Sequence, residues 1–345
     1  MKVAVYEGIK SITLQDRPAL STAPGEVIVK IKYCGICGTD LHIYYEGLLP
    51  PPMVLGHENV GTIADIGRGV EGWNIGDRVA IGPPGPCGNC HYCNHGYPSI
   101  CETGFVRTNG LGPGHDGGMA EYMKVREPET MLHKIPPEVS FEDSVLIDTI
   151  AVGLRGIIQS RFKIGDNVVV SGAGPIGLGT IQWLSIAGAR HITALEPSEK
   201  KRQLALKLGA DNVLNPLEER EGLRDKISDL YGGLGADIAF ECAGVPPAFE
   251  TSLDLIRGAG QLLVLGHSEN LVSINDSRMV LRESNIKASN AYSGEEVVIC
   301  LDFLARGRFD TKGFLEDIIS LDDILEKGFE RLKADQDLMK IAVAP

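Results

Sequence analysis

Four cysteines, the residues with the clearest chemical signature in the chain, lie within fifteen positions, at Cys87, Cys90, Cys93 and Cys101. Zinc in structural sites takes four ligands in a tetrahedron, and C-x-x-C steps let a single loop supply thiolates. Because a shell of four cysteines leaves no position for a substrate, we predict a structural zinc site.

Two alternative interpretations of this loop fit less well. A bacterial iron–sulfur pattern places the fourth cysteine after three residues and before a proline. Here seven residues separate Cys93 from Cys101, and Glu102 follows. A DNA-binding zinc ribbon would have basic neighbours, which are scarce in this segment.

A second set of possible ligands lies outside the loop. Catalytic zinc has three protein ligands and one open position, and Cys37 and His57 are candidates, with Glu58 next to His57. The acidic candidate is Asp148, a single carboxylate after three apolar residues, which is costly to bury without a cation. The alternatives are that Cys37 and His57 are ordinary core or surface residues and that Asp148 caps a helix.

A glycine-rich turn indicates a nucleotide site. The G-x-G-x-x-G pattern follows an apolar strand and opens a helix, the context that gives it meaning; it consists of Gly172, Ala173, Gly174, Pro175, Ile176 and Gly177. The first glycine permits a tight turn, the second admits the pyrophosphate and the third allows helix and strand to pack closely. The helix N-terminus then faces the phosphate charge.

Glu196 indicates which dinucleotide binds. It follows the second strand, about twenty residues after the turn, where a carboxylate accepts the ribose hydroxyls and repels a 2′-phosphate. We therefore predict NAD rather than NADP, a preference that the nearby Lys200, Lys201 and Arg202 could soften. The alternative is a glycine-rich turn in an α/β domain that binds no nucleotide.

The elements that must position these residues belong to two parts of the chain with different secondary structure. The chain up to about residue 148 is β-rich, with strands predicted at 27–33 and 61–66. From about residue 165, short apolar strands alternate with helices, which predicts a doubly wound parallel sheet. Helices are predicted at 175–187 and after Ser198, which can cap its helix, and strands at 167–171, 192–195, 212–214, 238–241, 262–265 and 286–289.

Composition excludes several classes of protein. A length of 345 residues favours two domains. The net charge of −13 argues against binding nucleic acid or anionic membranes. No segment approaches the ~18–20 apolar residues of a membrane span, and the N-terminus lacks the apolar core of a signal peptide. Eight cysteines in such a chain indicate reduced thiols or metal ligands, so we expect a cytoplasmic protein.

Taken together and in this order, the motifs resemble the zinc-dependent medium-chain dehydrogenases, which include alcohol, sorbitol and threonine dehydrogenases. The resemblance implies a GroES-like β-barrel catalytic domain interrupted by a Rossmann domain, with divisions at 1–149, 150–290 and 291–345. It implies that Cys37, His57 and Asp148 hold the catalytic zinc, that Glu58 is a conditional fourth ligand, and that Asp40 orients the zinc-bound histidine.

The resemblance also implies catalytic and cofactor contacts. Thr39 would take the proton of the alcohol and His42 would pass it to solvent. Lys201 would contact the cofactor ribose, and Lys340 would lie near the pyrophosphate. The segment Leu265, Gly266 and His267 would pass next to the nicotinamide. The implied activity is NAD-dependent interconversion of a secondary alcohol and its ketone, by a homotetramer or homodimer with two zinc ions per chain.

The substrate stays open at this stage. Residues 37–44 resemble threonine dehydrogenases, but Thr149 stands where polyol dehydrogenases generally have proline, and Arg155 departs from many relatives. The candidates are a polyol, a diol, L-threonine, or an unusual alcohol such as a hydroxyacyl-CoA or a phosphorylated or sulfonated alcohol. Zinc-free quinone reductases of the same fold and a non-enzymatic binding protein are the alternatives; they predict loss of the ligand sets or of the fingerprint, and this sequence keeps both.

Overall fold

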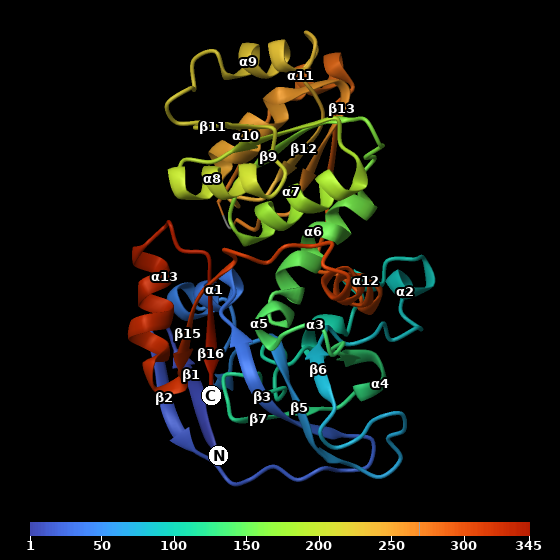
Figure 1. Cartoon of the computed structure of the whole chain (residues 1–345), viewed down its shortest axis with the longest axis vertical. Helices are drawn as coiled ribbons and strands as arrows, with labels where there is room; N and C mark the ends of the chain where they lie inside the picture. The colour runs from blue at the N-terminus through green and yellow to red at the C-terminus, as the bar shows by residue number, and fades with distance from the viewer. Residues whose placement is uncertain (269) are drawn as a thin grey trace. The chain divides into compact units, whose positions relative to one another are not determined.

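The computed structural model describes residues 1–268 and 270–345, which form two compact units (Figure 1). The first unit comprises Met1–Asp148 and Tyr292–Pro345, and the second comprises Thr149–Ala291. Each boundary lies one residue from the division expected from the sequence. The first unit is therefore built from both ends of the chain, and the second is a continuous insertion.

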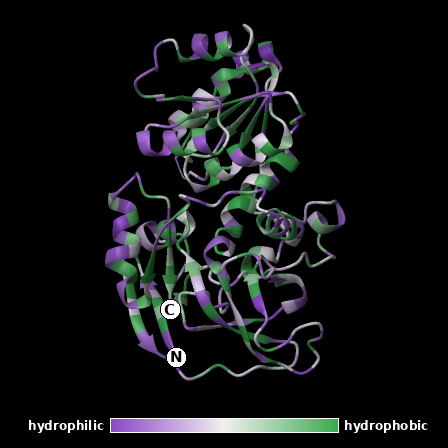
Figure 2. Cartoon of the chain, in the orientation of Figure 1, coloured by the Kyte–Doolittle hydropathy of each residue, from purple (hydrophilic) through white to green (hydrophobic). Residues whose placement is uncertain are grey.

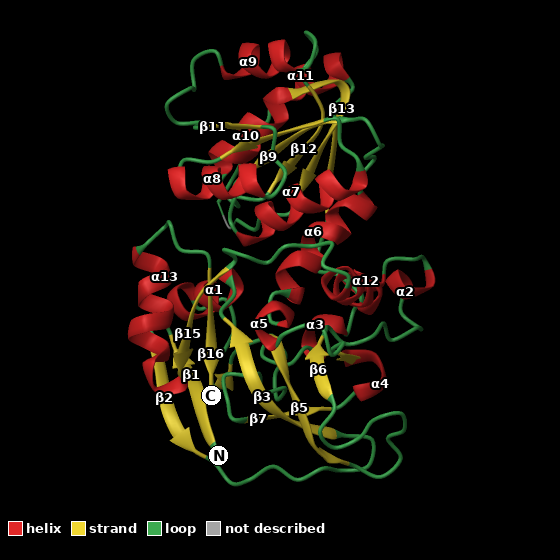
Figure 3. Ribbon diagram, viewed as in Figure 1, coloured by secondary structure: helices red, strands yellow, loops and turns green. Residues whose placement is uncertain are grey.

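The first unit contains two β-sheets (Figure 3). One has the strand order β2-β1-β4, and the larger has the order β15-β16-β3-β5-β6-β8, with β7 pairing with β3. Strand β16 from the C-terminal segment runs antiparallel to β3, so the last residues complete a sheet begun near residue 27. The strands are β1 Lys2–Gly8, β2 Ser11–Asp16, β3 Val27–Gly35, β4 Met53–Val54, β5 Glu58–Ile66, β6 Arg78–Ile81, β7 Tyr122–Val125, β8 Leu132–Lys134, β15 Leu315–Ser320 and β16 Lys340–Ala344.

Helices of the first unit are mostly short and connect these strands. They are α1 Gly38–Glu46, α2 His91–Asn94, η1 Pro98–Ile100, α3 Gly104–Arg107, α4 Pro128–Met131, α5 Phe141–Ser144, α12 Gly294–Ala305, η2 Leu321–Asp323, η3 Ile324–Glu330 and α13 Arg331–Ala334. The core of this unit joins buried side chains from β1, β3, β5 and β16. Figure 2 shows this segregation, with hydrophobic inner strands and more hydrophilic outer helices.

The second unit is a six-stranded parallel sheet in the order β11-β10-β9-β12-β13-β14. Helices cover both faces, α7 and α8 on one and α9 and α10 on the other (Figure 1). Because helices cover both faces of the sheet, the middle of its central strand β9 is apolar, and Val168, Val169 and Val170 are 0% exposed. The elements are β9 Asn167–Ser171, α7 Pro175–Ala187, β10 His191–Leu195, α8 Glu199–Lys207, β11 Asn212–Leu214, α9 Leu223–Leu230, β12 Ala236–Glu241, α10 Pro246–Leu255, β13 Ile256–Val264, α11 Asp276–Arg282 and β14 Asn285–Ala288; α6, Ile147–Gln159, begins in the first unit and continues into the second.

These bounds confirm the predicted alternation of strands and helices. Strand β9 and helix α7 match the predicted ranges residue for residue, and the Ser198 hydroxyl caps α8 by accepting the N–H of Lys201. The largest error is β13, which begins six residues before the predicted 262. Its first half contains Gly258 and Gly260, and glycine weakens the sequence signal of a strand.

None of the described helices has the length and apolar character that crossing a membrane requires.

Candidate functional site

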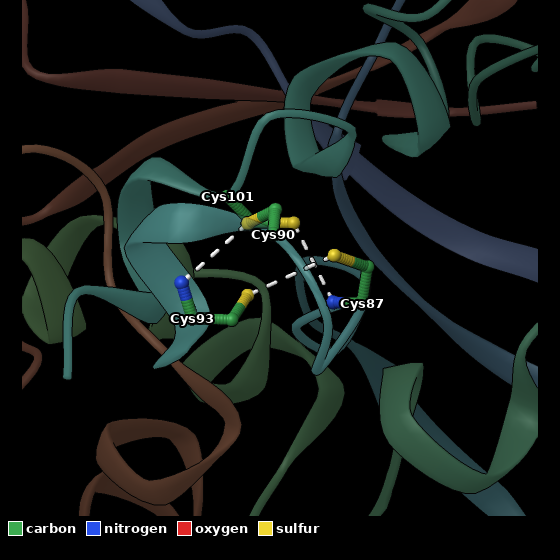
Figure 4. A group of neighbouring side chains, drawn as sticks. All are labelled: Cys87, Cys90, Cys93 and Cys101. Atoms are coloured by element: carbon green, nitrogen blue, oxygen red, sulfur yellow. Dashed lines mark hydrogen bonds between the residues drawn. The ribbon is translucent and has the colours of Figure 1, made fainter. Parts of the chain in front are cut away.

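The four cysteines of the loop converge (Figure 4). Their sulfur atoms all lie within 4.8 Å of one another, and Sγ of Cys87 is 3.9 Å from Sγ of Cys93. With Zn–S bonds of about 2.3 Å, two sulfurs of a tetrahedral zinc site lie roughly 3.8 Å apart. All four thiols are free, and the spacing fits a closed zinc site.

Backbone amides point at two of these sulfurs. The N–H of Cys93 donates to Sγ of Cys90 (3.5 Å), and the N–H of Cys87 donates to Sγ of Cys101 (3.4 Å). Burial opposes ionisation of Cys101, but the amide of Cys87 and the hydroxyl of Thr103 lower its pKa to about 5. An N–H aimed at sulfur stabilises the thiolate, the form that binds metal.

The segment that carries these cysteines has almost no core of its own. Among residues 83–108, only Cys101 is buried. Its base is tied to helix α4 by the N–H of Gly85, which donates to the Thr130 hydroxyl (3.1 Å), and by an ion pair between Arg107 and Glu127, the residue before that helix. We call residues 83–108 the cysteine lobe.

The second ligand set forms at the start of helix α1. One ligand atom from each of Cys37, His57 and Glu58 lies within 4.8 Å of the others. Cys37 directly precedes α1, and the other two residues lie where β5 begins. The pairing of β3 with β5 brings Gly35 opposite Glu58, so the sheet register places the residues from two segments together.

Asp40 is buried next to this group, beside both Cys37 and His57. It is 0% exposed, its Oδ2 accepts the N–H of Cys37 (2.9 Å), and its Oδ1 lies 3.6 Å from Nδ1 of His57. Burial alone would lower the pKa of His57, but the charges of Asp40 and Cys37 raise it well above its usual value. With Nδ1 directed at Asp40, Nε2 is the nitrogen available to a metal.

Glu58 has a buried cationic partner. Both of its carboxylate oxygens contact Nζ of Lys340, at 2.6 and 2.7 Å, and both residues are at most 5% exposed. Burial would lower the pKa of Lys340, but the Glu58 carboxylate raises it. The resemblance placed Lys340 near the pyrophosphate. In the structure its ammonium group instead pairs with Glu58 inside the first unit.

Asp148 lies next to this group but is not part of it. It occupies the first turn of α6, a favourable place for a carboxylate. Its Oδ2 accepts a hydrogen bond from the hydroxyl of Tyr292, which is 6% exposed. Its charge raises the pKa of Tyr292, after the larger effect of burial, and also acts on Glu58. The structure therefore brings Glu58, rather than Asp148, into contact distance with Cys37 and His57.

Thr39 and His42 lie three residues apart on α1, a spacing that places side chains on one face of a helix. The Thr39 hydroxyl is 3.8 Å from Sγ of Cys37. The side chain of His42 is 33% exposed, and its Nδ1 is 3.0 Å from Oε2 of Glu46. The helix thus sets a hydroxyl beside the metal ligands and an imidazole nearer to solvent.

In the second unit, the glycine-rich turn joins β9 to α7. A Cβ at Gly177 would lie 1.9 Å from the carbonyl oxygen of Gly172, so close packing requires glycine there. A Cβ at Gly174 would meet nothing within 4 Å, which leaves open space above the N-terminus of α7. Pro175 and Ile176 form the first turn of that helix, whose free N–H groups suit a phosphate.

Glu196 follows β10 and holds the turn in place. Its Oε2 accepts the N–H of Ala173 (2.8 Å), and its Oε1 accepts the N–H of Ser198 (2.9 Å). Arg202 donates to the carbonyl oxygens of Glu196 and Pro197 and forms an ion pair with Glu199. Lys201 lies in the first turns of α8, close to this carboxylate in sequence and space.

Sequence reasoning missed two buried partners. Tyr292 is 144 positions from Asp148, and no local pattern marks it as a hydrogen-bond donor. Glu241 lies at the end of β12, where its carboxylate contacts the loops after β12 and β13, including Gly266 of the predicted nicotinamide segment. The available signal was an acidic residue directly after three apolar residues, Ile238, Ala239 and Phe240, at the end of the strand.

Comparison with known proteins places these sites in a family. A family model described as the alcohol dehydrogenase GroES-like domain matches residues 23–137, and one described as zinc-binding dehydrogenase matches residues 175–306. The (R,R)-butanediol dehydrogenase of Bacillus subtilis (strain 168) is 33% identical over 362 residues, covering 100% of both chains. The sorbitol dehydrogenase of the same strain is 30% identical, covering 100% of this chain and 97% of its own.

Solved structures agree with the sequence relatives. The crystal structure of 2R,3R-butanediol dehydrogenase from Bacillus subtilis superposes with a TM-score of 0.89 at 32% identity, covering 100% of this chain and 99% of that one. The sheet order of the second unit and the mixed sheets of the first are thus those of a Rossmann domain and a GroES-like domain. The chain belongs to the zinc-dependent medium-chain alcohol dehydrogenase family.

Proposed function

We propose that the protein catalyses the reversible oxidation of a secondary alcohol to a ketone with NAD, using one catalytic and one structural zinc per chain. The observation that carries the proposal is the group of Cys37, His57 and Glu58, with the Thr39 hydroxyl beside it. The four-cysteine group of the cysteine lobe is a second, closed ligand set. Separate closed and open sets suit separate structural and catalytic ions.

The residues of the first unit divide the proton chemistry among them. Zn²⁺ held by Cys37, His57 and a carboxylate would supply a Lewis acid that lowers the pKa of an alcohol hydroxyl. Thr39 is placed to accept the hydroxyl proton, and His42, on the same helix face, to release it to solvent. The Asp40 carboxylate, 3.6 Å from Nδ1 of His57, favours the ring orientation that turns Nε2 to the metal.

The second unit supplies the electron acceptor. Bound NAD would accept the hydride of the carbinol C–H bond, with its two electrons, at the nicotinamide ring, while the hydroxyl proton would leave separately and the alcohol would become a ketone. The turn around Gly174 and the carboxylate of Glu196 would bind the pyrophosphate and the adenosine ribose. The hydride chemistry itself belongs to the cofactor.

The substrate we favour is a vicinal diol or a polyol, because the butanediol and sorbitol dehydrogenases match this chain over its full length. A homotetramer or homodimer in the cytoplasm is part of the proposal. The family supports the oligomer, and the eight free thiols support the cytoplasm.

The test is NADH formation across 2,3-butanediol, sorbitol, xylitol, L-threonine and simple secondary alcohols, with zinc measured in the same preparation. Two zinc ions per chain and turnover of a diol or polyol would support the proposal. Turnover of L-threonine alone would move the substrate to the hydroxy-amino-acid class. Turnover in protein free of zinc would contradict the mechanism.

Glu196→Gln should change the choice of cofactor. The neutral amide no longer repels a 2′-phosphate and accepts ribose hydroxyls less well, so we expect kcat/KM with NAD to fall roughly tenfold or more. The ratio of NAD to NADP activity should fall further. Steady-state kinetics with both cofactors measures it, and an unchanged ratio would show that Glu196 does not face the ribose.

Tyr292→Phe should weaken the catalytic zinc if Asp148 is a ligand. Loss of the hydroxyl that orients a ligating carboxylate typically lowers metal affinity ~10–100-fold. Chelator competition, with cobalt substitution to follow the site by its visible absorption, measures the change. Tyr231→Phe is the matched control, since that buried tyrosine binds Val168 and Thr193 in the second unit. Equal zinc retention in both variants would leave Glu58 as the carboxylate ligand.

A further inference from the structure

Glu241 is a buried carboxylate that the proposed mechanism does not use. It is the last residue of β12 and is 2% exposed. Its Oε1 accepts two backbone N–H groups of the following loop, from Ala243 at 2.9 Å and Gly244 at 2.8 Å. One side chain therefore fixes the start of the β12–α10 connection.

The same residue also holds the loop that follows β13. The N–H groups of Leu265 and Gly266 donate to the carbonyl oxygen of Glu241, at 2.8 and 2.9 Å. A Cβ at Gly266 would lie 2.5 Å from Oε2 of Glu241 and 2.3 Å from the backbone nitrogen of Gly244. The backbone carbonyl of Glu241 thus holds the loop after β13, while its carboxylate holds Ala243 and Gly244 and packs against Gly266.

Burying a carboxylate to hold these two loops together costs folding free energy. Burial raises the pKa of Glu241, and the N–H groups of Gly244, Ala243 and Gly266 lower it only in part. Among residues 1–268 and 270–345, no Lys, Arg or His forms an ion pair with it. A buried charge without a cation is weak as a source of stability, which points to a role in function.

The topology indicates what these loops receive. In a sheet of this strand order, a dinucleotide binds along the carboxyl ends of the strands, across the point where the order reverses. Glu196 marks the adenosine half at the end of β10. The nicotinamide half would then lie against the loops after β12 and β13, the two loops that Glu241 holds together.

We propose that Glu241 is a positioning residue for the nicotinamide half of NAD, acting through residues 242–244 and 265–267. The inference rests on the proposed NAD dependence. It predicts that the side chain matters for the nicotinamide ring and not for the rest of the dinucleotide. ADP-ribose, which lacks the ring, is the probe that separates the two.

The experiment measures the dissociation constants of NADH and ADP-ribose by calorimetry for the wild type, Glu241→Gln and Glu241→Ala. The amide presents N–H groups where Oε2 packs on Gly266, so we expect NADH binding to weaken roughly tenfold in the Gln variant and more in Ala. ADP-ribose binding should change less than about twofold by the same reasoning. Asp237→Asn is the control, because Asp237 accepts the N–H of Asn167 at the opposite end of β12.

Each outcome decides a different point. Equal weakening of NADH and ADP-ribose in the Gln variant would indicate general damage to the second unit and overturn the inference, as would no change in either. If Ala does not fold, the Gln variant alone carries the test. A wild-type protein that binds neither ligand would refute the NAD proposal itself, whereas normal wild-type binding with an unaffected Gln variant would refute only the role of Glu241.

Discussion

Cys37→Ser should bind NADH as the wild type does and lose nearly all turnover. Serine can still begin α1, because its hydroxyl is a favoured N-cap, but it is a poor zinc ligand. Loss of the Lewis acid removes several kcal/mol of transition-state stabilisation. At about 1.4 kcal/mol per tenfold, kcat/KM should fall roughly a thousandfold or more. Steady-state kinetics, zinc analysis and NADH titration on one preparation measure all three properties.

Zinc content identifies the cause of the loss. We expect one zinc per chain instead of two, since the cysteine lobe keeps its four ligands. Cys300→Ala is the matched control: Cys300 is a buried thiol of α12 outside both ligand groups. It should keep two zinc ions and most activity. An inactive Cys37→Ser protein that still holds two zinc ions would assign Cys37 another role.

The second unit was predictable because its signals are local. Strand β9, the turn from Gly172 to Gly177 and helix α7 follow one another in a single stretch of chain, and a strand covered on both faces has an apolar middle, here three valines. The turn chemistry and the cap of Ser198 depend on neighbours in sequence. Here pattern and tertiary structure agree at every level.

The first unit shows where sequence reasoning stops. Glu58 and Lys340 are 282 positions apart, and Asp148 and Tyr292 are 144 apart, so neither pairing leaves a local trace. The sequence offered Cys37 and His57, with Asp148 as the acidic candidate, and the resemblance implied the three as ligands. Only the register of β3 against β5 shows that Glu58 joins the cysteine and histidine in one group. Which carboxylate completes the set stays a prediction, tested by Tyr292→Phe.

The same physics predicts that the order of the cysteine lobe depends on bound metal. A segment in which Cys101 is the one buried residue cannot be stabilised by hydrophobic packing. Zinc binding to such sites contributes folding free energy of about 10–16 kcal/mol in isolated zinc-binding peptides. Cys101→Ser should therefore lose one zinc and release residues 83–108, which hydrogen exchange and limited proteolysis would detect as new exchange and cleavage inside the lobe.

The second unit provides the internal reference for that experiment, because its core contains no residue of the lobe. Hydrogen exchange in β9 and β12 and the affinity for NADH should stay as in the wild type, while turnover falls only as far as the lobe supports the first unit. Removal of zinc from the wild type by a chelator should reproduce the pattern inside residues 83–108. A Cys101→Ser protein with one zinc and an unchanged, protected lobe would show that Arg107, Glu127 and the contacts at the base of the lobe hold it without metal.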